Sequence, residues 1–148
     1  MHARRSIILA ATGALQPLIT GGTVTAVRAG RAAPMPVAQA PYLLVYGRRE
    51  RSSPSTIGPG RKLLRELTLA IEAVTASADD SDGLVDALAS AVEATLAGDP
   101  TLGGAAKDLY LSATDLDARA EGEDRIGRAR LEFTVTYLTV ASAPDQAA

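Results

Sequence analysis

The residues able to perform acid–base, nucleophilic or metal chemistry are few in this chain. Its 148 residues include no cysteine and one histidine, His2, close to the N-terminus. Disulfides, thiolate nucleophiles and cysteine zinc sites are therefore excluded, and catalysis or zinc binding by histidine is disfavoured. No serine lies in a Gly-x-Ser-x-Gly elbow, and none has a usable histidine as a base. The sequence predicts no enzyme, no cofactor and no metal site.

Two groups of acidic residues offer alternatives to that prediction. Residues 79–83, Asp-Asp-Ser-Asp-Gly, contain the oxygen ligands that calcium prefers, but their register does not fit a calcium loop. Acids directly before an apolar helix favour a helix start instead. Asp115 and Asp117 share one face of a predicted strand, a geometry that glycoside hydrolysis uses. Because they lie at a strand end beside Arg119, a solvated rim is the simpler interpretation.

The basic residues of the middle segment are the best candidates for contacts with a partner. Residues 47–60 are rich in Gly, Pro and Ser and carry Arg48, Arg49 and Arg51, so a long basic loop is expected. Arg61 and Lys62 follow directly. The glycines before them, Gly58 and Gly60, do not have the spacing of a phosphate-binding loop. No aromatic residues interleave with the arginines to stack bases. These five residues are the predicted interface, with a solvated loop as the alternative.

The charge is divided unevenly along the chain. Residues 1–65 hold ten Lys and Arg against one acid, whereas residues 66–148 hold five against sixteen acids, although the net charge is only −2. Such a division can place a basic surface opposite an acidic one. It is compatible with two solvated surfaces, or with head-to-tail pairing of identical subunits, a contact that closes into rings.

The element around which the chain is organised is a long strand over residues 128–139. Leu131, Phe133, Val135 and Tyr137 alternate with polar residues, and no Gly or Pro interrupts them after Arg128. This face holds the only Phe of a chain without Trp. We therefore expect a sheet with one buried face to be built around it.

The remaining pattern predicts one α+β domain over residues 1–140, followed by a flexible tail at 141–148. We expect a mostly antiparallel four- to five-stranded sheet with two helices packed on one face. Helices are predicted at residues 3–15 and 84–97, and strands at residues 23–27, 41–46, 61–75, 108–116 and 128–139. Arg4 and Arg5, followed by an apolar run, leave a cleaved signal peptide as an alternative to the first helix.

The order of these features resembles the tail-terminator proteins of long-tailed phages, the family of the lambda minor tail protein U. The resemblance covers most of the chain and includes no catalytic signature. It rests on the N-terminal helix, the strand at 41–46, the strand and helix from Leu63 to Leu102, and the acidic turn 121–124 followed by residues 129–137.

The resemblance implies a small α+β virion protein that forms a homo-oligomeric ring, a hexamer in that family. Such a ring caps the tail tube at the head-proximal end, stops its polymerisation, and contacts the tube protein and the head–tail connector. DNA passes through the lumen without sequence-specific binding, and assembly takes place in the host cytoplasm without a membrane. The alternatives are a connector, tail-completion or tube protein, or an exported α+β binding protein if the N-terminus is a signal peptide.

Overall fold

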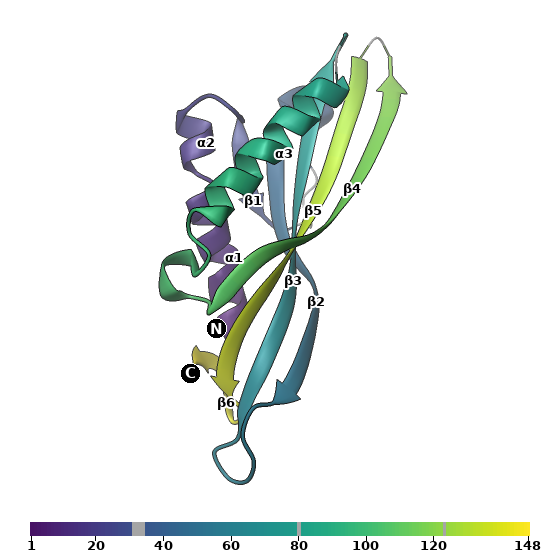
Figure 1. Cartoon of the computed structure of the whole chain (residues 1–148). Coiled ribbons are helices and arrows are strands. Elements are labelled where there is room, and N and C mark those ends of the chain that lie inside the picture. Colours follow the sequence, from purple (N-terminus) through teal and green to yellow (C-terminus); the bar gives the residue numbers. More distant parts are fainter. Residues whose placement is uncertain (31–34, 80, 123) are drawn as a thin grey trace.

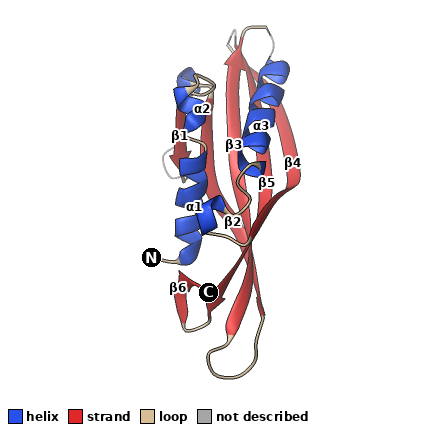
Figure 2. Cartoon of the chain, turned by 60° about the vertical axis from the view of Figure 1, so that its left-hand side comes forward, coloured by secondary structure: helices blue, strands red, loops and turns tan. Residues whose placement is uncertain are grey.

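The computed structural model describes residues 1–30, 35–79, 81–122 and 124–148. The fold is α+β, with one mostly antiparallel sheet and helices on one side of it (Figures 1 and 2). Short 3-10 turns lie at Val37–Gln39 and Leu102–Gly104. The longer elements are α1 (Ala3–Ala14), α2 (Pro17–Thr20), β1 (Ala26–Ala29), β2 (Tyr42–Pro54), β3 (Lys62–Ser77), α3 (Ser81–Ala97), β4 (Asp108–Glu121), β5 (Asp124–Val140) and β6 (Ala143–Ala147).

The sheet has the strand order β1-β2-β3-β5-β4, and β6 also pairs with β5. All pairs are antiparallel except β1 with β2. The strands β3 and β5 pair along their whole lengths, from Lys62 opposite Val140 to Ser77 opposite Arg125. The predicted organising strand is therefore confirmed as a central strand, and it begins four residues earlier than expected.

The main core lies between this sheet and the helices α1 and α3. Leu131, Phe133, Val135 and Tyr137 are at most 2% exposed and belong to this core, as their alternation predicted. The apolar residues of α1 recur at helical spacing and join the same core, so residues 3–14 are a packed helix. We call the side of the sheet that these helices cover the helix face and the other side the open face.

A second, smaller core lies on the open face at the upper end of β2. Tyr42, Leu44 and Tyr46 are buried there with Met35 and with residues of β3 and β5. Leu43 and Val45 point to the helix face and are fully buried as well. Burial on both faces explains why residues 42–46 are apolar without alternation.

Three sequence predictions are wrong in detail. Among the described residues the sheet has six strands, not four or five, because β6 adds to the five strands that were expected. Residues 47–54, predicted as loop, continue β2, since they pair with β3 as far as Pro54 opposite Leu63. Residues 143–147, predicted as part of a flexible tail, form β6. They fill the edge of β5 beyond Thr136, where the pairing of β5 with β4 ends.

The pairing of β2 with β3 produces an arm that extends below the helices (Figure 1). Its tip, residues 55–61, is closed by a hydrogen bond from the Ser55 backbone N–H to the Lys62 carbonyl at 2.8 Å. Ile57 at this tip is 88% exposed. β5 pairs with β3 along this arm, but the outer edge of β2 has no partner there among the described residues, and such an edge is suited to contacts with other chains.

Candidate interaction surface

A β-bulge in β2 decides which side chains reach each face of the arm. Gly47 pairs with Leu69 and Arg49 pairs with Thr68, so Arg48 is an extra residue in β2. An extra residue reverses the alternation of every later side chain. Glu50 is thereby directed to the helix face, while Arg49 and Arg51 lie on the open face.

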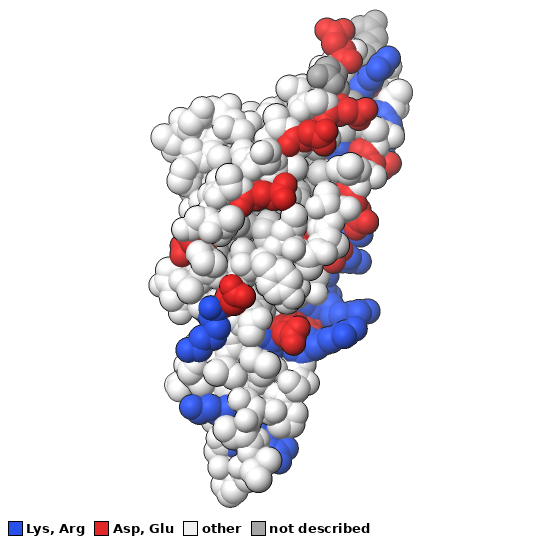
Figure 3. All heavy atoms as spheres, in the orientation of Figure 1, with Lys and Arg blue, Asp and Glu red and all other residues white. Residues whose placement is uncertain are grey.

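Three of the five predicted interface residues come together at this bulge. The Arg48 guanidinium lies 2.5 Å from the Glu132 carboxylate. Among the described residues, Arg49 and Arg51 form no ion pair. Arg48, Arg49, Thr68 and Glu132 line a polar cleft of about 290 Å³ on the open face. Figure 3 shows basic side chains gathered at this level of the molecule, with acidic ones concentrated above them.

Arg61 and Lys62, the other two predicted interface residues, lie apart from this cluster. Both are exposed at the tip of the arm. The Lys62 backbone N–H donates to the Thr56 hydroxyl at 2.8 Å, so this part of the chain closes the turn. Arg51 lies opposite Glu66 of β3. Lys62 is four positions away from Glu66 on the same strand, so about 13 Å separate it from the level of Arg51. The structure therefore divides the predicted interface into a bulge cluster and a tip.

A buried ionic cluster on the helix face was not predicted from the sequence. The Glu50 carboxylate, whose side chain is 8% exposed, lies 2.8 Å from Arg4 of α1 and 3.0 Å from Arg65 of β3. The Tyr137 hydroxyl donates a hydrogen bond to the same carboxylate. Arg65 also donates to the Thr139 hydroxyl at 2.7 Å. This cluster joins α1, β2, β3 and β5, and it satisfies a carboxylate that would be costly to bury alone.

The cluster alters the titration of the groups around it. Burial raises the pKa of Tyr137, and the hydrogen bond to the Glu50 carboxylate raises it further. Burial lowers the pKa of His2, and the positive charges of Arg4 and Arg65 add to this effect. The His2 Nδ1 accepts a hydrogen bond from the Arg4 backbone N–H at 3.0 Å, so this histidine caps α1.

The acidic pair that suggested glycoside chemistry belongs to a row of charges on the open face. Arg130 lies 3.0 Å from Asp115, and its Nε is 3.5 Å from Glu132. The hydrogen bond to the Asp115 carboxylate raises the pKa of Arg130. Within the described part of the chain, Asp117 and Asp108 form no ion pair. Asp115 is thus engaged with Arg130 rather than paired with Asp117. The predicted strand end is wrong, because β4 continues to Glu121 and both acids lie within the strand.

The calcium alternative at residues 79–83 includes Asp80, which lies outside the described residues. The helix α3 begins at Ser81 with Asp82 in its first turn, which agrees with the helix-start interpretation. Across the described residues, no three His, Cys, Asp or Glu side chains lie close enough to hold a metal ion. In the same part of the chain, no helix is sufficiently long and apolar to cross a membrane.

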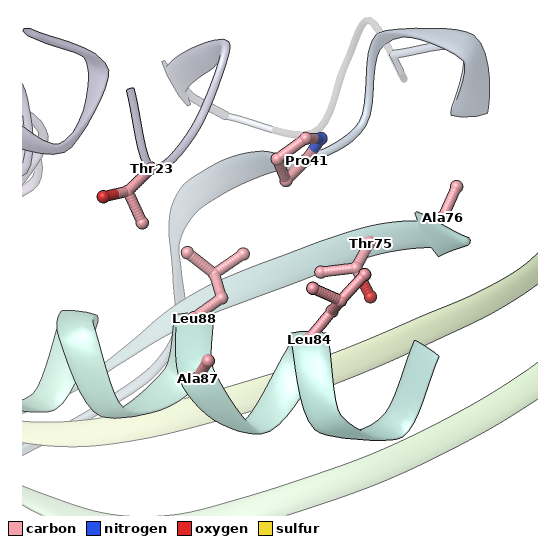
Figure 4. Close-up of a pocket in the computed structure, with 7 residues that line it drawn as sticks. All are labelled: Thr23, Pro41, Thr75, Ala76, Leu84, Ala87 and Leu88. Carbon is pink, nitrogen blue, oxygen red and sulfur yellow. The ribbon is translucent and has the colours of Figure 1, made fainter. Parts of the chain in front are cut away.

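A separate apolar pocket of about 190 Å³ lies between α3 and the upper end of β3 (Figure 4). Leu84, Ala87 and Leu88 line it from α3, and Thr75, Ala76, Thr23 and Pro41 line the remainder. Leu84 is 47% exposed at its mouth. The lining contains two hydroxyl groups and no charged side chain, so the pocket offers no group for acid–base chemistry.

Comparisons with known proteins find similarity among solved structures. No family model matches the chain, and no curated protein matches it. A similar solved structure is described as the virion of native gene transfer agent (GTA) particle, with a TM-score of 0.49 and 18% sequence identity. The aligned region covers 85% of this chain and 90% of that chain.

Proposed function

We propose that this chain is a structural protein of a phage-like virion and acts as its tail terminator. In this role, copies of the chain form a ring, with six as the expected number, on the head-proximal end of the tail tube. The ring stops polymerisation of the tube and provides the surface to which the head–tail connector binds. DNA passes through the ring without sequence-specific contacts.

The observation that carries this proposal is the form of the candidate surface. The arm extends past the helices, and its base presents Arg49 and Arg51 as exposed charges without an ion pair among the described residues. A surface of extended backbone and unpaired charge suits binding to another chain. The sequence resemblance to tail terminators supplies the kind of assembly, and the observed α+β fold agrees with that resemblance.

Electron microscopy of particles made without this protein tests the proposal. A tail terminator limits the length of the tube, so we expect overlong tails that carry no heads. Supplying the intact chain should restore tails of normal length joined to heads. Full heads accompanied by separate tails of normal length would contradict the proposal and identify a connector instead. Absence of any tube would identify a tube subunit.

A further inference from the structure

The sheet has two long open edges on opposite sides. β1 pairs only with Tyr42–Val45 of β2, so residues 46–54 of β2 have no partner on their outer side among the described residues. β4 forms the other edge and likewise pairs only with β5 within the described chain. Open edges present unpaired backbone N–H and C=O groups, which are able to pair with another strand.

These two edges carry opposite charges on the same face of the sheet. Arg49 and Arg51 lie opposite Thr68 and Glu66, on the open face. Asp115 and Asp117 of β4 lie opposite Arg130 and Arg128 of β5, which also belong to that face. Two such edges placed side by side would bring arginines against aspartates, whereas two copies of the same edge would repel each other.

The side chains of β4 also suggest that this edge is covered. Tyr110 is 53% exposed and Leu116 is 65% exposed, although large hydrophobic side chains are usually buried. β4 extends over 14 residues and contains no proline, the residue that commonly blocks pairing at an edge. β4 carries four acids against one base, Arg119. This excess of acids disfavours the pairing of like edges and favours pairing with a basic strand.

We infer that the basic edge of β2 in one copy pairs, in antiparallel direction, with the acidic edge of β4 in the next copy. This inference rests on the proposed ring and specifies its contact. β2 and β4 run in opposite directions within the sheet, because three antiparallel pairings separate them. Copies that all point the same way along a ring axis therefore present antiparallel edges to each other. The contact is head-to-tail, as ring closure requires.

The charges set the register of this contact. Placing Arg49 opposite Asp117 also places Arg51 opposite Asp115, because both pairs are two residues apart in antiparallel strands. Within one chain, Arg49 lies level with Thr134 of β5, and Asp117 lies level with Arg128 of the same strand. These two levels are six residues apart, so pairing Arg49 with Asp117 of the next copy shifts that copy by six positions along the strands. That shift is about 20 Å at ~3.3 Å per residue.

The shift is compatible with closure of the ring. Each copy contributes β2, β3, β5 and β4 to the joined sheet, a width of about 19 Å at ~4.8 Å per strand. A shift of about 20 Å over this width inclines the strands by about 45° to the ring axis. This is the upper end of the tilt at which strands close into barrels.

Disulfide cross-linking tests the contact directly, because the chain has no cysteine of its own. In the inferred register Ser52 of one copy lies opposite Thr114 of the next, and both residues are exposed. We expect the S52C/T114C variant to form a ladder of covalent oligomers on mild oxidation. Within one chain the two positions are three strand spacings apart across the sheet, about 14 Å, and six positions apart along it, about 20 Å, so they lie beyond the reach of a disulfide.

Three control variants define the result. The single variants S52C and T114C report pairing of like edges, and the S52C/A120C variant reports pairing in another register. We expect monomers with at most trace dimers from all three. A strong dimer band from a single variant, a ladder from S52C/A120C, or no ladder from S52C/T114C would overturn the inference. Light scattering on the same unoxidised samples shows whether a ring is present, which separates failure of this contact from failure of the proposed ring.

A charge exchange gives an independent test. The variants Arg49→Asp and Asp117→Arg should each lose assembly by light scattering, since each places like charges across the contact. Mixed in equal amounts, they should regain it, because alternating copies restore one attractive pair at every contact. Assembly of either variant alone, or no assembly in the mixture, would contradict the inferred pairing.

Discussion

At the scale of single residues, the most informative position is Glu50. It is the only acid in the first 65 residues, and the sequence places it among exposed arginines. The structure instead buries it against Arg4, Arg65 and Tyr137, because the bulge at Arg48 reverses the alternation of β2. One extra residue in a strand therefore separates a buried anchor from an exposed basic surface.

Replacing Glu50 with Gln should reduce the free energy of unfolding by about 3–5 kcal/mol, the usual cost of breaking a buried ion pair. The change leaves Arg65, whose side chain is 11% exposed, without its carboxylate partner. Urea denaturation followed by circular dichroism measures the effect.

The matched control is Glu66→Gln on β3, an exposed residue that should change stability by less than about 0.5 kcal/mol. Equal stability of the Glu50 and Glu66 variants would show that the buried cluster contributes nothing to the fold.

At the scale of elements, α1 is the segment whose role the sequence left open. Residues 3–14 read either as a packed helix or as part of a signal peptide. In the fold, Ile7 and Leu15 are fully buried, and α1 completes the helical cover of β2. Arg4 of the same helix binds the buried Glu50 carboxylate. Removal of this segment would therefore expose residues of the main core and also break the ionic cluster at Glu50.

Two neighbouring positions of α1 test its packing. Ile7→Ala should lower the free energy of unfolding by about 2–5 kcal/mol, because it empties a fully buried site. Leu9→Ala on the same helix is the control. Leu9 is 43% exposed, so we expect a clearly smaller loss. Thermal or urea unfolding of both variants measures the difference, and similar losses at the two positions would contradict the packing of α1.

At the scale of the whole molecule, the division of charge becomes a division in space. Three basic residues of the first half, Arg48, Arg49 and Arg51, gather at the bulge of β2, and several acids of the second half lie along β4 and α3 (Figure 3). The sheet places these strands at opposite edges. An assembly formed through such surfaces should weaken as salt is added, since exposed charges are screened beyond about 8 Å at physiological ionic strength.

The double variant R49E/R51E should therefore fail to assemble while its monomer stability changes by less than about 0.5 kcal/mol. Arg48 is left in place because its ion pair with Glu132 belongs to the fold of the subunit. The control R5E/R125E has the same change of net charge at exposed positions of α1 and β5, outside the inferred contact. Light scattering measures assembly and urea denaturation measures stability. Normal assembly of R49E/R51E would leave the bulge cluster as a solvated surface.

The sequence by itself determined the features that depend on local pattern. Alternation in residues 131–137 specified the inner face of β5, and helical spacing specified α1 and α3, because side-chain periodicity follows directly from backbone geometry. The same reasoning found Arg48, Arg49 and Arg51 as candidate contacts, though in a loop instead of a strand.

Only the tertiary structure decided features that depend on pairing between distant residues. The extension of β2 to Pro54 comes from backbone bonds to β3, and β6 comes from the edge of β5 that β4 leaves free. The burial of Glu50 depends on a bulge that no residue type announces. Backbone hydrogen bonding is nearly independent of side-chain identity, so these pairings, and the two open edges they leave, could not be read from the chain alone.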